Sequence, residues 1–330
     1  MSRLILAVPS KGRLQEQANA YFADAGLAMS KAAGARGYRA TLESLPEIDV
    51  MLLSAGEIAD ALLAGDAHLG ITGEDLIRES APSLEGRVAL VKPLSFGYAD
   101  VVVAVPQAWI DVASMADLDD VCAAFYQRHR RRLRVATKYV NLTRGFFARH
   151  GIWDYRIVES GGATEGAPSA GIAEAIVDIT TTGATLAANN LKTLSDGTIL
   201  KSRATLAAGL AAKWDADAAG QAKMLLARLA ARERARAALV LRARLHGPSG
   251  GGPDAAITAL GKLGVTVLSR PARGNAGGEF ALLCPRGKLT EAVTLLRRRG
   301  GGGAVTAQTV DYVFETEDPL VAEFERSIAR

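Results

Sequence analysis

The sequence predicts an α/β protein made of two lobes and a smaller C-terminal module. Short β-branched runs alternate with helical segments through residue 237, which is typical of parallel sheets covered by helices. Two glycine-containing joints, at 94–100 and 183–200, interrupt this part of the chain. After residue 237 the expected order becomes βαββαβ, which is the ferredoxin-like split motif.

The strands expected in the two lobes are short runs rich in Val, Ile and Leu. They lie at 4–8, 50–53, 69–72, 88–93, 101–105, 134–137, 156–159, 176–180 and 199–202. The helices expected between them lie at 12–25, 56–64, 115–130, 141–150 and 215–236. A chain of 330 residues is also longer than one ordinary core requires, which favours more than one domain.

The two joints predict where the chain passes between the lobes. We expect lobe I to comprise 1–98 and 185–237, and lobe II to comprise 99–184. A chain that leaves one lobe and later returns to it crosses the junction twice, so a hinged cleft is expected between the lobes. The third domain is expected at 238–330.

The C-terminal module has its own order of elements. Strands are expected at 238–245, 265–269, 279–284 and 304–314, with helices at 254–263 and 288–299. A final helical stretch at 318–329 lies beyond this motif, and its role stays open.

Charge and cysteine content exclude several classes of protein. The 39 Lys and Arg against 35 Asp and Glu give a net charge of +4, and the basic runs lie on helical patterns without interleaved aromatic residues. Solvated helix faces explain such runs, so we expect no nucleic-acid partner. Cys122 and Cys284 lie too far apart for a metal-binding pair and are expected to be buried thiols. No apolar run is long enough to be a signal peptide or a membrane span, so a cytoplasmic protein without a membrane partner is expected.

The most informative stretch is 165–191, where an apolar strand at 176–180 ends in a carboxylate and a threonine-glycine turn opens a helix. Free N–H groups at a helix start attract anions, and hydroxyl groups can donate to a phosphate. Asp178 precedes this turn and suits the two vicinal hydroxyls of a sugar, so the stretch predicts a site for ribose 5-phosphate. A plain strand-to-helix junction with threonine caps is the alternative. The predicted phosphate cradle comprises Thr180, Thr181, Thr182, Gly183, Ala184 and Thr185.

Two other turns follow expected strands and carry charged residues. Lys11 can neutralise a pyrophosphate, and Arg13 can clamp a phosphate chain or stack on adenine. Gly73, Glu74 and Asp75 form the second turn, whose carboxylates suit an adenine amino group or a hydrated metal ion. Surface charge at the first turn and capping of the following helix at the second are the alternatives.

These motifs occur together in one order: RLILAVPSKGRL, DAHLGITGEDLI, LSFGYADVVVAVP, RVATKYVNLTRGFFARHGI, EGAP and VDITTTGATLAANNLK. In this order they resemble ATP phosphoribosyltransferases, the glycosyltransferases that begin histidine biosynthesis. The resemblance covers about residues 1–238. Residues 239–330 resemble, more loosely, the C-terminal regulatory domain of the long form of that family.

The resemblance implies a two-lobed core like a type II periplasmic binding protein, with the substrates between the lobes. It implies that adenine N1 of ATP attacks 5-phosphoribosyl 1-pyrophosphate, in the presence of Mg²⁺, and that pyrophosphate leaves. Asp178, Glu165 and Lys11 are then the expected catalytic residues, and Arg13 with the 73–75 turn is expected to bind ATP. Direct metal ligands are not identified; Mg²⁺ is expected through the pyrophosphate and through Asp178 or Glu165.

The resemblance also implies assembly of identical subunits, as dimers or hexamers, and histidine as an inhibitor bound by the C-terminal module. The glycine-rich runs 247–252 and 300–303 leave the residues of that pocket unidentified. The chain departs from the family pattern at His68, where an Asp is usual, and a lone buried histidine is expected to be structural. A cytosolic two-lobed small-molecule sensor, or a regulatory subunit without catalysis, remains the alternative function.

Overall fold

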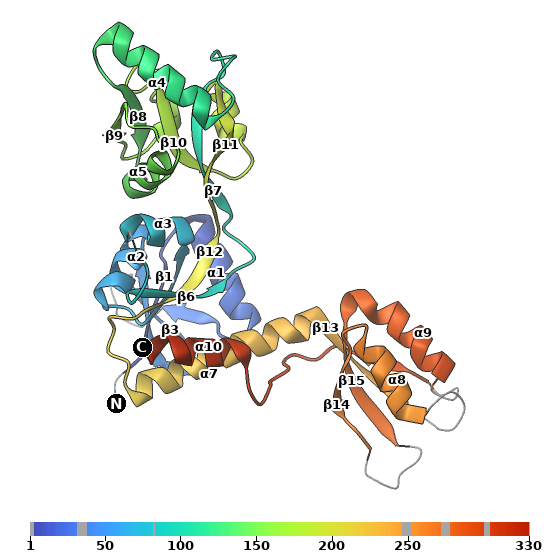
Figure 1. The fold of residues 1–330 in the computed structure, drawn as a ribbon. Coiled ribbons are helices and arrows are strands. Elements are labelled where there is room, and N and C mark those ends of the chain that lie inside the picture. Colours follow the sequence, from blue (N-terminus) through green and yellow to red (C-terminus); the bar gives the residue numbers. More distant parts are fainter. Residues whose placement is uncertain are drawn as a thin grey trace. The chain divides into compact units, whose positions relative to one another are not determined.

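The computed structural model describes residues 3–31, 38–81, 83–245, 252–271, 278–299 and 304–329. The chain forms two compact units, residues 1–222 with 323–330, and residues 223–322 (Figure 1). The first unit contains a seven-stranded and a five-stranded sheet, and the second contains a four-stranded sheet. The expected α/β class is therefore confirmed.

Lobe I is built on the seven-stranded sheet, in which the strands follow the order β2-β3-β4-β1-β5-β12-β6. Strand β1 pairs in parallel with β4 and β5, whereas β12 pairs antiparallel with β5 and β6. The strands are β1 (Ile5–Pro9), β2 (Met29–Lys31), β3 (Arg39–Leu42), β4 (Leu45–Leu53), β5 (Leu69–Gly73), β6 (Val88–Pro93) and β12 (Ala204–Gly209). The helices are α1 (Gly12–Asp24), α2 (Ala55–Ala64) and α3 (Glu74–Ser80).

Local sequence explains the limits of α2. Ser54 and Glu57 form a capping box at its start, so two backbone N–H groups are satisfied there. Gly65 ends the helix with a φ of 82°, and a Cβ atom at this position would lie 2.6 Å from the carbonyl oxygen of Ala211. Only glycine fits this turn without strain.

Lobe II is built on the five-stranded sheet, in the order β11-β7-β10-β8-β9. Its strands are β7 (Ala99–Pro106), β8 (Leu133–Thr137), β9 (Tyr155–Glu159), β10 (Ala175–Thr180) and β11 (Leu191–Ser202). Its helices are α4 (Met115–His129), α5 (Val140–Arg149) and α6 (Ala184–Ala188). The sheet and helices enclose an apolar core that includes Val103, Cys122 and Phe147.

Both sheets share one strand order around a crossing strand. In lobe I the shared order is β4-β1-β5-β12-β6, and β12 runs antiparallel between β5 and β6. In lobe II the corresponding order is β9-β8-β10-β7-β11, and β7 runs antiparallel between β10 and β11. Each crossing strand enters from the other lobe, so the chain passes the junction twice (Figure 1). This arrangement confirms the two-lobed prediction.

The second passage lies later in the chain than expected. Strand β11 pairs with β7 from Leu191 to Ser202, so this whole segment belongs to the sheet of lobe II. We expected the chain to return to lobe I at residue 185, but it returns only after β11. The strand was not recognised in full because a register shift between Thr193 and Thr198 interrupts its pairing. That irregularity, around Gly197, hides the long strand from a simple alternation pattern.

The second unit has the order β13, α8, β14, β15, α9, β16, and its sheet order is β14-β15-β13-β16 with antiparallel pairs. The elements are β13 (Ala238–Arg244), α8 (Gly252–Gly261), β14 (Thr266–Ser269), β15 (Glu279–Pro285), α9 (Leu289–Arg299) and β16 (Thr306–Gln308). The ferredoxin-like prediction is confirmed. Residues 247–251 and 300–303 of the two glycine-rich runs lie outside the described residues.

Strand β16 is much shorter than the expected strand at 304–314. The chain after it turns to the long helix α7 (Ala216–Ala237). The Val313 N–H donates to the Ala231 carbonyl at 3.0 Å, and Arg234 donates to the Val313 carbonyl at 2.7 Å. These contacts satisfy both backbone polar groups of Val313 without a strand partner.

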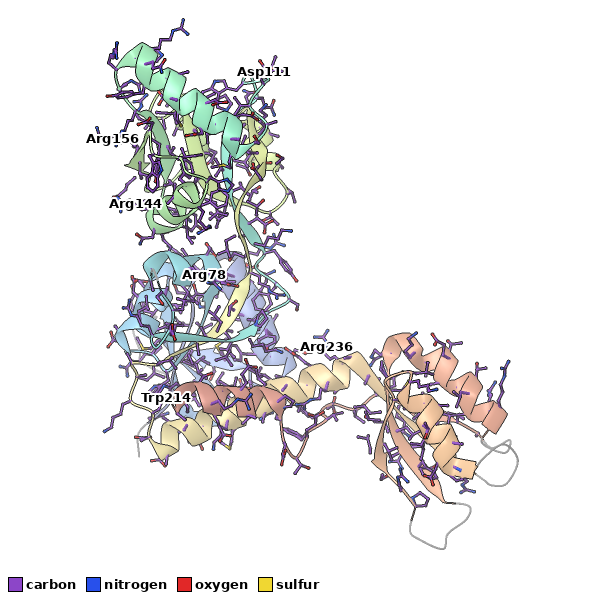
Figure 2. The ribbon with its side chains drawn as sticks, viewed as in Figure 1. Arg78, Asp111, Arg144, Arg156, Trp214 and Arg236 are labelled. Carbon is purple, nitrogen blue, oxygen red and sulfur yellow. The ribbon has the colours of Figure 1, made fainter. Side chains whose placement is uncertain are left out.

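The last helix, α10 (Pro319–Ile328), attaches the end of the chain to lobe I. Phe324 is only 1% exposed, and its ring lies 5.2 Å from that of Trp214 in an edge-to-face arrangement. Trp214, labelled in Figure 2, donates from Nε1 to the Gly209 carbonyl at 2.9 Å. The helix whose role the sequence leaves open is thus packed against the first unit.

Candidate functional site

A cavity of about 600 Å³ lies between the two lobes of the first unit. Lobe I contributes residues from α1 and from the turns after β5 and β6, and lobe II contributes residues from the ends of β8 and β10. Residues that line it include Arg13, Gly73, Asp75, Phe96, Gly97, Tyr98, Lys138, Tyr139, Ile179 and Thr181. Four of the predicted site residues, Arg13, Gly73, Asp75 and Thr181, are thus brought together.

The threonine-glycine turn after β10 is open. Gly183 has a φ of 77° and is the N-cap of the short helix α6, and no atom lies within 4 Å of the position that a Cβ atom would take. The hydroxyl oxygen of Thr180 accepts from the Gly183 N–H at 2.8 Å, and Thr181 donates to the Tyr98 carbonyl at 3.1 Å. Thr182, Ala184 and Thr185 are exposed beside them.

Asp178 lies on β10, two residues before the turn, and is half-buried. Its Oδ1 accepts from the Ile179 N–H at 2.8 Å. Burial raises the pKa of Asp178, and the charge of Glu165 raises this pKa further, whereas Lys138 lowers it. Two carboxylates and one ammonium group therefore interact electrostatically at this end of the sheet.

Glu165 lies in a short turn, Thr164–Gly166. A cluster of two arginines and one carboxylate supports the other end of the loop that follows this turn. Arg134 donates to the Gly171 carbonyl at 2.9 Å and to Glu174 at 2.8 Å, and Arg131 donates to Glu174 at 2.9 Å. Burial opposes ionisation of Glu174, but the hydrogen bonds from Arg134 and Arg131 outweigh it and lower the pKa of Glu174 to about 2. This cluster holds the loop between Glu165 and β10.

The first predicted loop presents two exposed basic residues. Lys11 is the N-cap of α1, and Arg13 follows in the first turn of that helix. Only Arg13 is among the residues that line the cavity. Hydrogen bonds from Ser54 lower the pKa of Glu57, and the charge of Lys11 adds to this effect, so Lys11 lies near the start of α2.

Asp75 is 4% exposed and connects the lobes. The Tyr139 hydroxyl of lobe II donates to Asp75 Oδ2 at 2.6 Å, and the Ser202 hydroxyl at the end of β11 donates to Oδ1 at 2.8 Å. Both oxygens of this carboxylate already accept hydrogen bonds, so a nucleotide would have to share them. Gly73 permits the arrangement, because a Cβ atom there would lie 2.3 Å from Asp75 Oδ1. The neighbouring Glu74 pairs with Arg78 at 2.7 Å.

A second hydrogen-bonded link joins helix α3 of lobe I to helix α5 of lobe II. The Glu79 carboxylate accepts from the backbone N–H groups of Asn141 at 2.8 Å and Leu142 at 3.0 Å. A carboxylate of one lobe thus caps the N-terminus of a helix in the other, where the positive end of the helix dipole favours it. The two links fix how α3 meets α5 beside the cavity.

Sequence reasoning missed Lys138, Tyr139 and Tyr98. Lys138 follows β8 at the same edge of the sheet as Asp178, and its Nζ lies 4.9 Å from the centre of the Tyr139 ring. Tyr139 is fully buried, and burial raises its pKa. The signal that points to Lys138 is its place at the carboxyl end of a parallel strand, where ligands of α/β sheets bind.

His68 has a structural role. It is 7% exposed, its Nδ1 accepts from the Ile5 N–H at 3.1 Å, and its Nε2 lies 3.1 Å from the Lys213 carbonyl, to which it donates. Because both ring nitrogens are engaged by the backbone, the ring is satisfied without a ligand.

Metal and thiol chemistry have few candidates in the described parts of the chain. No group of three or more His, Cys, Asp and Glu side chains that could hold a metal ion occurs there. Cys122 and Cys284 are buried, as expected, and burial raises the pKa of Cys122 to about 12. No helix among the described residues is long and apolar enough to cross a membrane.

Comparison with known proteins points to one family. The family model for ATP phosphoribosyltransferase (HisG) matches residues 54–231. An ATP phosphoribosyltransferase of Bradyrhizobium diazoefficiens is 53% identical over 329 residues, which cover 99% of this chain and 98% of that relative. One of Rhodopseudomonas palustris (strain BisB18) is 53% identical over 321 residues, 97% of each chain. Among solved structures, the ATP phosphoribosyl transferase (HisG:HisZ) complex from Thermotoga maritima is 26% identical, with a TM-score of 0.48, over 62% of this chain and 87% of that chain.

Proposed function

The chain belongs to the ATP phosphoribosyltransferase family, and on this premise we propose that it joins ATP, through adenine N1, to 5-phosphoribosyl 1-pyrophosphate. The products are phosphoribosyl-ATP and pyrophosphate, and the reaction is the first step of histidine biosynthesis. One observation carries the proposal: Asp178 precedes an open threonine-glycine turn whose Thr181 lines the cavity between the lobes.

The ribose 5-phosphate is held by the turn from Thr180 to Thr185. Its hydroxyl and backbone N–H groups donate to the phosphate oxygens, in place of the bonds that the Gly183 N–H makes to Thr180 and the Thr181 hydroxyl makes to Tyr98. Gly183 leaves room for the phosphate to approach the backbone. Asp178 accepts from the vicinal ribose hydroxyls. Its raised pKa supports this role, because a half-buried carboxylate gains most from donors that replace water.

The reaction replaces one bond with another at the anomeric carbon. The adenine N1 lone pair forms the new C–N bond while the C–O bond to pyrophosphate breaks and its electrons leave with that group. No covalent intermediate on the protein is needed, so the residues act by orientation and by electrostatic stabilisation. Lys11 and Lys138 balance the charge that develops on pyrophosphate, and Glu165 with Asp178 stabilises the positive charge that develops on the ribose.

ATP is bound on the lobe I side of the cavity. Arg13 clamps its phosphates or stacks on adenine, and Gly73, which lines the cavity, leaves room for the Asp75 carboxylate at the turn before α3. Glu74 pairs with Arg78, and Asp75 holds the turn through its links to Tyr139 and Ser202. In this proposal Asp75 binds ATP by sharing its oxygens and positions the turn at the same time.

Mg²⁺ suits the residues at this site. Burial raises the pKa of Asp178, and the charge of Glu165 raises this pKa further, so a bound cation would stabilise the ionised Asp178 carboxylate. Proteins usually bind Mg²⁺ through one or two carboxylates together with substrate phosphates, so a cluster of three protein ligands is not required. When bound, Mg²⁺ supplies charge stabilisation for the departing pyrophosphate.

A homo-oligomer and inhibition by histidine through the C-terminal module complete the proposal. Supporting it, the sequence similarity to the curated relatives continues through the second unit, which has the βαββαβ order. Initial rates at increasing histidine concentration test inhibition, and a flat response would remove it. Light scattering of the purified chain tests the number of subunits.

The activity is tested by mixing the purified chain with ATP, 5-phosphoribosyl 1-pyrophosphate and Mg²⁺. We expect the absorbance of phosphoribosyl-ATP to rise with release of an equal amount of pyrophosphate. If both substrates stabilise the protein against heat but no pyrophosphate is released, a sensor or regulatory subunit without catalysis replaces the enzymatic proposal.

A further inference from the structure

A second cavity, of about 580 Å³, lies between the lobes and shares none of its lining residues with the first. Its walls are Arg78 of α3, the residues Ala81, Ser83 and Leu84 that follow this helix, one face of α5, and part of β11. Pockets for small molecules have volumes of roughly 300–1,000 Å³, so the space suits a ligand of modest size. No role in the proposed reaction involves it.

The face of α5 that borders this cavity has an unusual residue at its centre. Asn141, Gly145 and Arg149 line the cavity at intervals of four residues, which places them on one side of the helix. Gly145 lies inside the helix, where glycine is less favourable than alanine by about 1 kcal/mol. A Cβ atom there would approach only Arg149 Nη1, at 3.7 Å, so the glycine leaves space open rather than avoiding a clash.

The charged side chains that line the cavity, Arg78 and Arg149, are both cationic, and the polar residues Ser83 and Asn141 are neutral. Arg78, labelled in Figure 2, uses Nε to pair with Glu74 at 2.7 Å, and its side chain is 40% exposed. The Arg149 guanidinium lies 5.5 Å from the centre of the Phe146 ring, and among the described residues it pairs with no carboxylate. The nearby Glu79 is engaged as the cap of α5. An anion would therefore meet donors rather than unpaired carboxylates.

The rest of the wall is apolar. Leu142, Ile199 and Leu200 line the cavity and also pack against the core of lobe II, while Leu84 lines it from lobe I. A cationic pair beside an apolar wall suits a molecule with one acidic group and one hydrophobic part.

One of the two inter-lobe links borders this cavity. Glu79, near the end of α3, caps α5 at Asn141, which itself lines this cavity. The other link joins Asp75, at the start of α3, to Tyr139, the residue before α5, and borders the first cavity. A ligand that contacts α3 and α5 together binds best when these helices are held as the two links hold them. By linkage, such a ligand and the substrates influence each other's affinity.

We propose that this cavity, between Arg78 and Arg149, binds a small organic anion with an apolar body, and that its occupancy stabilises the contact of α3 with α5. The acidic group is a carboxylate or a phosphate, and the apolar body lies against Leu142 and Leu200. This proposal is independent of the reaction in the first cavity.

The test is calorimetric titration of the full chain with benzoate and with phenyl phosphate, with benzyl alcohol as the uncharged comparison. We expect at least one of the two anions to bind and benzyl alcohol to bind about tenfold more weakly, because it lacks the charged group. The preferred anion identifies the acidic group. Arg149→Gln removes a cation and Gly145→Leu fills the cavity, and each is expected to raise the Kd of the anion about tenfold.

Two variants serve as controls. Gly145→Ala adds only a methyl group to the same position and favours the helix, so anion binding is expected to stay within about twofold. Lys138→Gln changes the first cavity alone and is expected to leave anion binding unchanged. Circular dichroism verifies that every variant is folded.

The contact of α3 with α5 is followed by amide hydrogen exchange. The bound anion is expected to slow exchange in both helices of the wild-type chain and not in Gly145→Leu. Several results would overturn the proposal: no binding of either anion, equal affinity in Gly145→Leu and Arg149→Gln, or loss of binding in Lys138→Gln, which would assign the anion to the first cavity. Unchanged exchange on binding would remove the stabilising role.

Discussion

Asp178 is a carboxylate that the candidate site needs, although its burial disfavours the ionised form. Its carboxylate lies on a buried strand, receives one hydrogen bond from the next backbone N–H, and experiences the charges of Glu165 and Lys138. Burial raises its pKa because water is withdrawn from the ionised form. In the described part of the chain the carboxylate accepts a hydrogen bond from the Ile179 N–H, and a residue with this burial cost is well suited to bind a ligand.

We predict that Asp178→Asn lowers turnover by about 10²–10³-fold, because the amide cannot stabilise positive charge on the ribose. The fold should be retained, since the amide is nearly the same size and its oxygen can still accept from Ile179. Initial rates of phosphoribosyl-ATP formation measure the effect. Asp154→Asn, an exposed carboxylate of the same lobe that pairs with Arg132 at 3.8 Å, is the control and should keep its rate. Turnover near that of wild type in Asp178→Asn would remove Asp178 from the site.

At the scale of elements, most strands and helices were predictable and the connections between them were not. Every strand expected in the two lobes has a counterpart, because Val- and Ile-rich runs carry a strong local signal. Strand β12, ATLAAG, was missed because alanine and glycine have little strand preference. It is a fully buried strand because β5 and β6 pair with both of its edges.

The same limit applies to the candidate site. The threonine turn and the strand-end loops are continuous in sequence, so their composition revealed them. The hydrogen bonds of Asp75 to Tyr139 and Ser202 join residues 64 and 127 positions apart, and no local pattern reports such contacts. Lys138 was missed for a related reason, because a lysine after a strand looks like ordinary surface charge until Asp178 is placed beside it.

The Glu174 cluster should make the stability of lobe II depend on pH. The pKa of Glu174 falls from an ordinary value of 4.5 to about 2 in the folded state, so its stabilising effect is complete above pH 4.5 and is lost as pH falls toward 2. We predict that Glu174→Gln has a lower Tm than wild type at pH 7, and that the difference shrinks between pH 4.5 and 2. Thermal unfolding followed by circular dichroism across this range is the measurement. A difference in Tm that does not change with pH would contradict the assignment.

Removal of one atom, the hydroxyl oxygen of Tyr139, should weaken the link between Asp75 and Tyr139. Tyr139→Phe keeps the buried ring and removes the hydroxyl, which leaves Asp75 Oδ2 without its donor. An unsatisfied buried acceptor costs about 1–3 kcal/mol, so we predict a decrease of that size in the free energy of unfolding. Urea denaturation measures it. Tyr126→Phe, whose ring is 45% exposed on α4, should leave stability unchanged, and an equal loss in both variants would argue against a specific role for this bond.

At the scale of the whole molecule, the chain is organised by segments that return to earlier parts. Strand β7 enters lobe II from lobe I, strand β12 enters lobe I from lobe II, and each pairs within the sheet of the lobe that it enters. Helix α10 returns to the first unit after the ferredoxin-like module. Such contacts are distant in sequence, so they increase the cooperativity of the fold and cannot be inferred from local pattern. They also mean that each lobe is incomplete without residues from both sides of a crossing.

The packing of α10 against lobe I should contribute to the stability of the first unit. Phe324 is 1% exposed and packs edge-to-face on Trp214, which also contacts His68 at a ring distance of 5.0 Å. Truncating a buried phenylalanine costs about 3–5 kcal/mol, so Phe324→Ala should lower the Tm of the first unit and expose the indole of Trp214 to water, shifting its fluorescence to longer wavelength. Phe314→Ala is the matched control, because that ring is 62% exposed and its loss should change neither quantity. If Phe324→Ala left both the Tm and the Trp214 fluorescence unchanged, the packing of Phe324 on Trp214 would contribute no stability to lobe I.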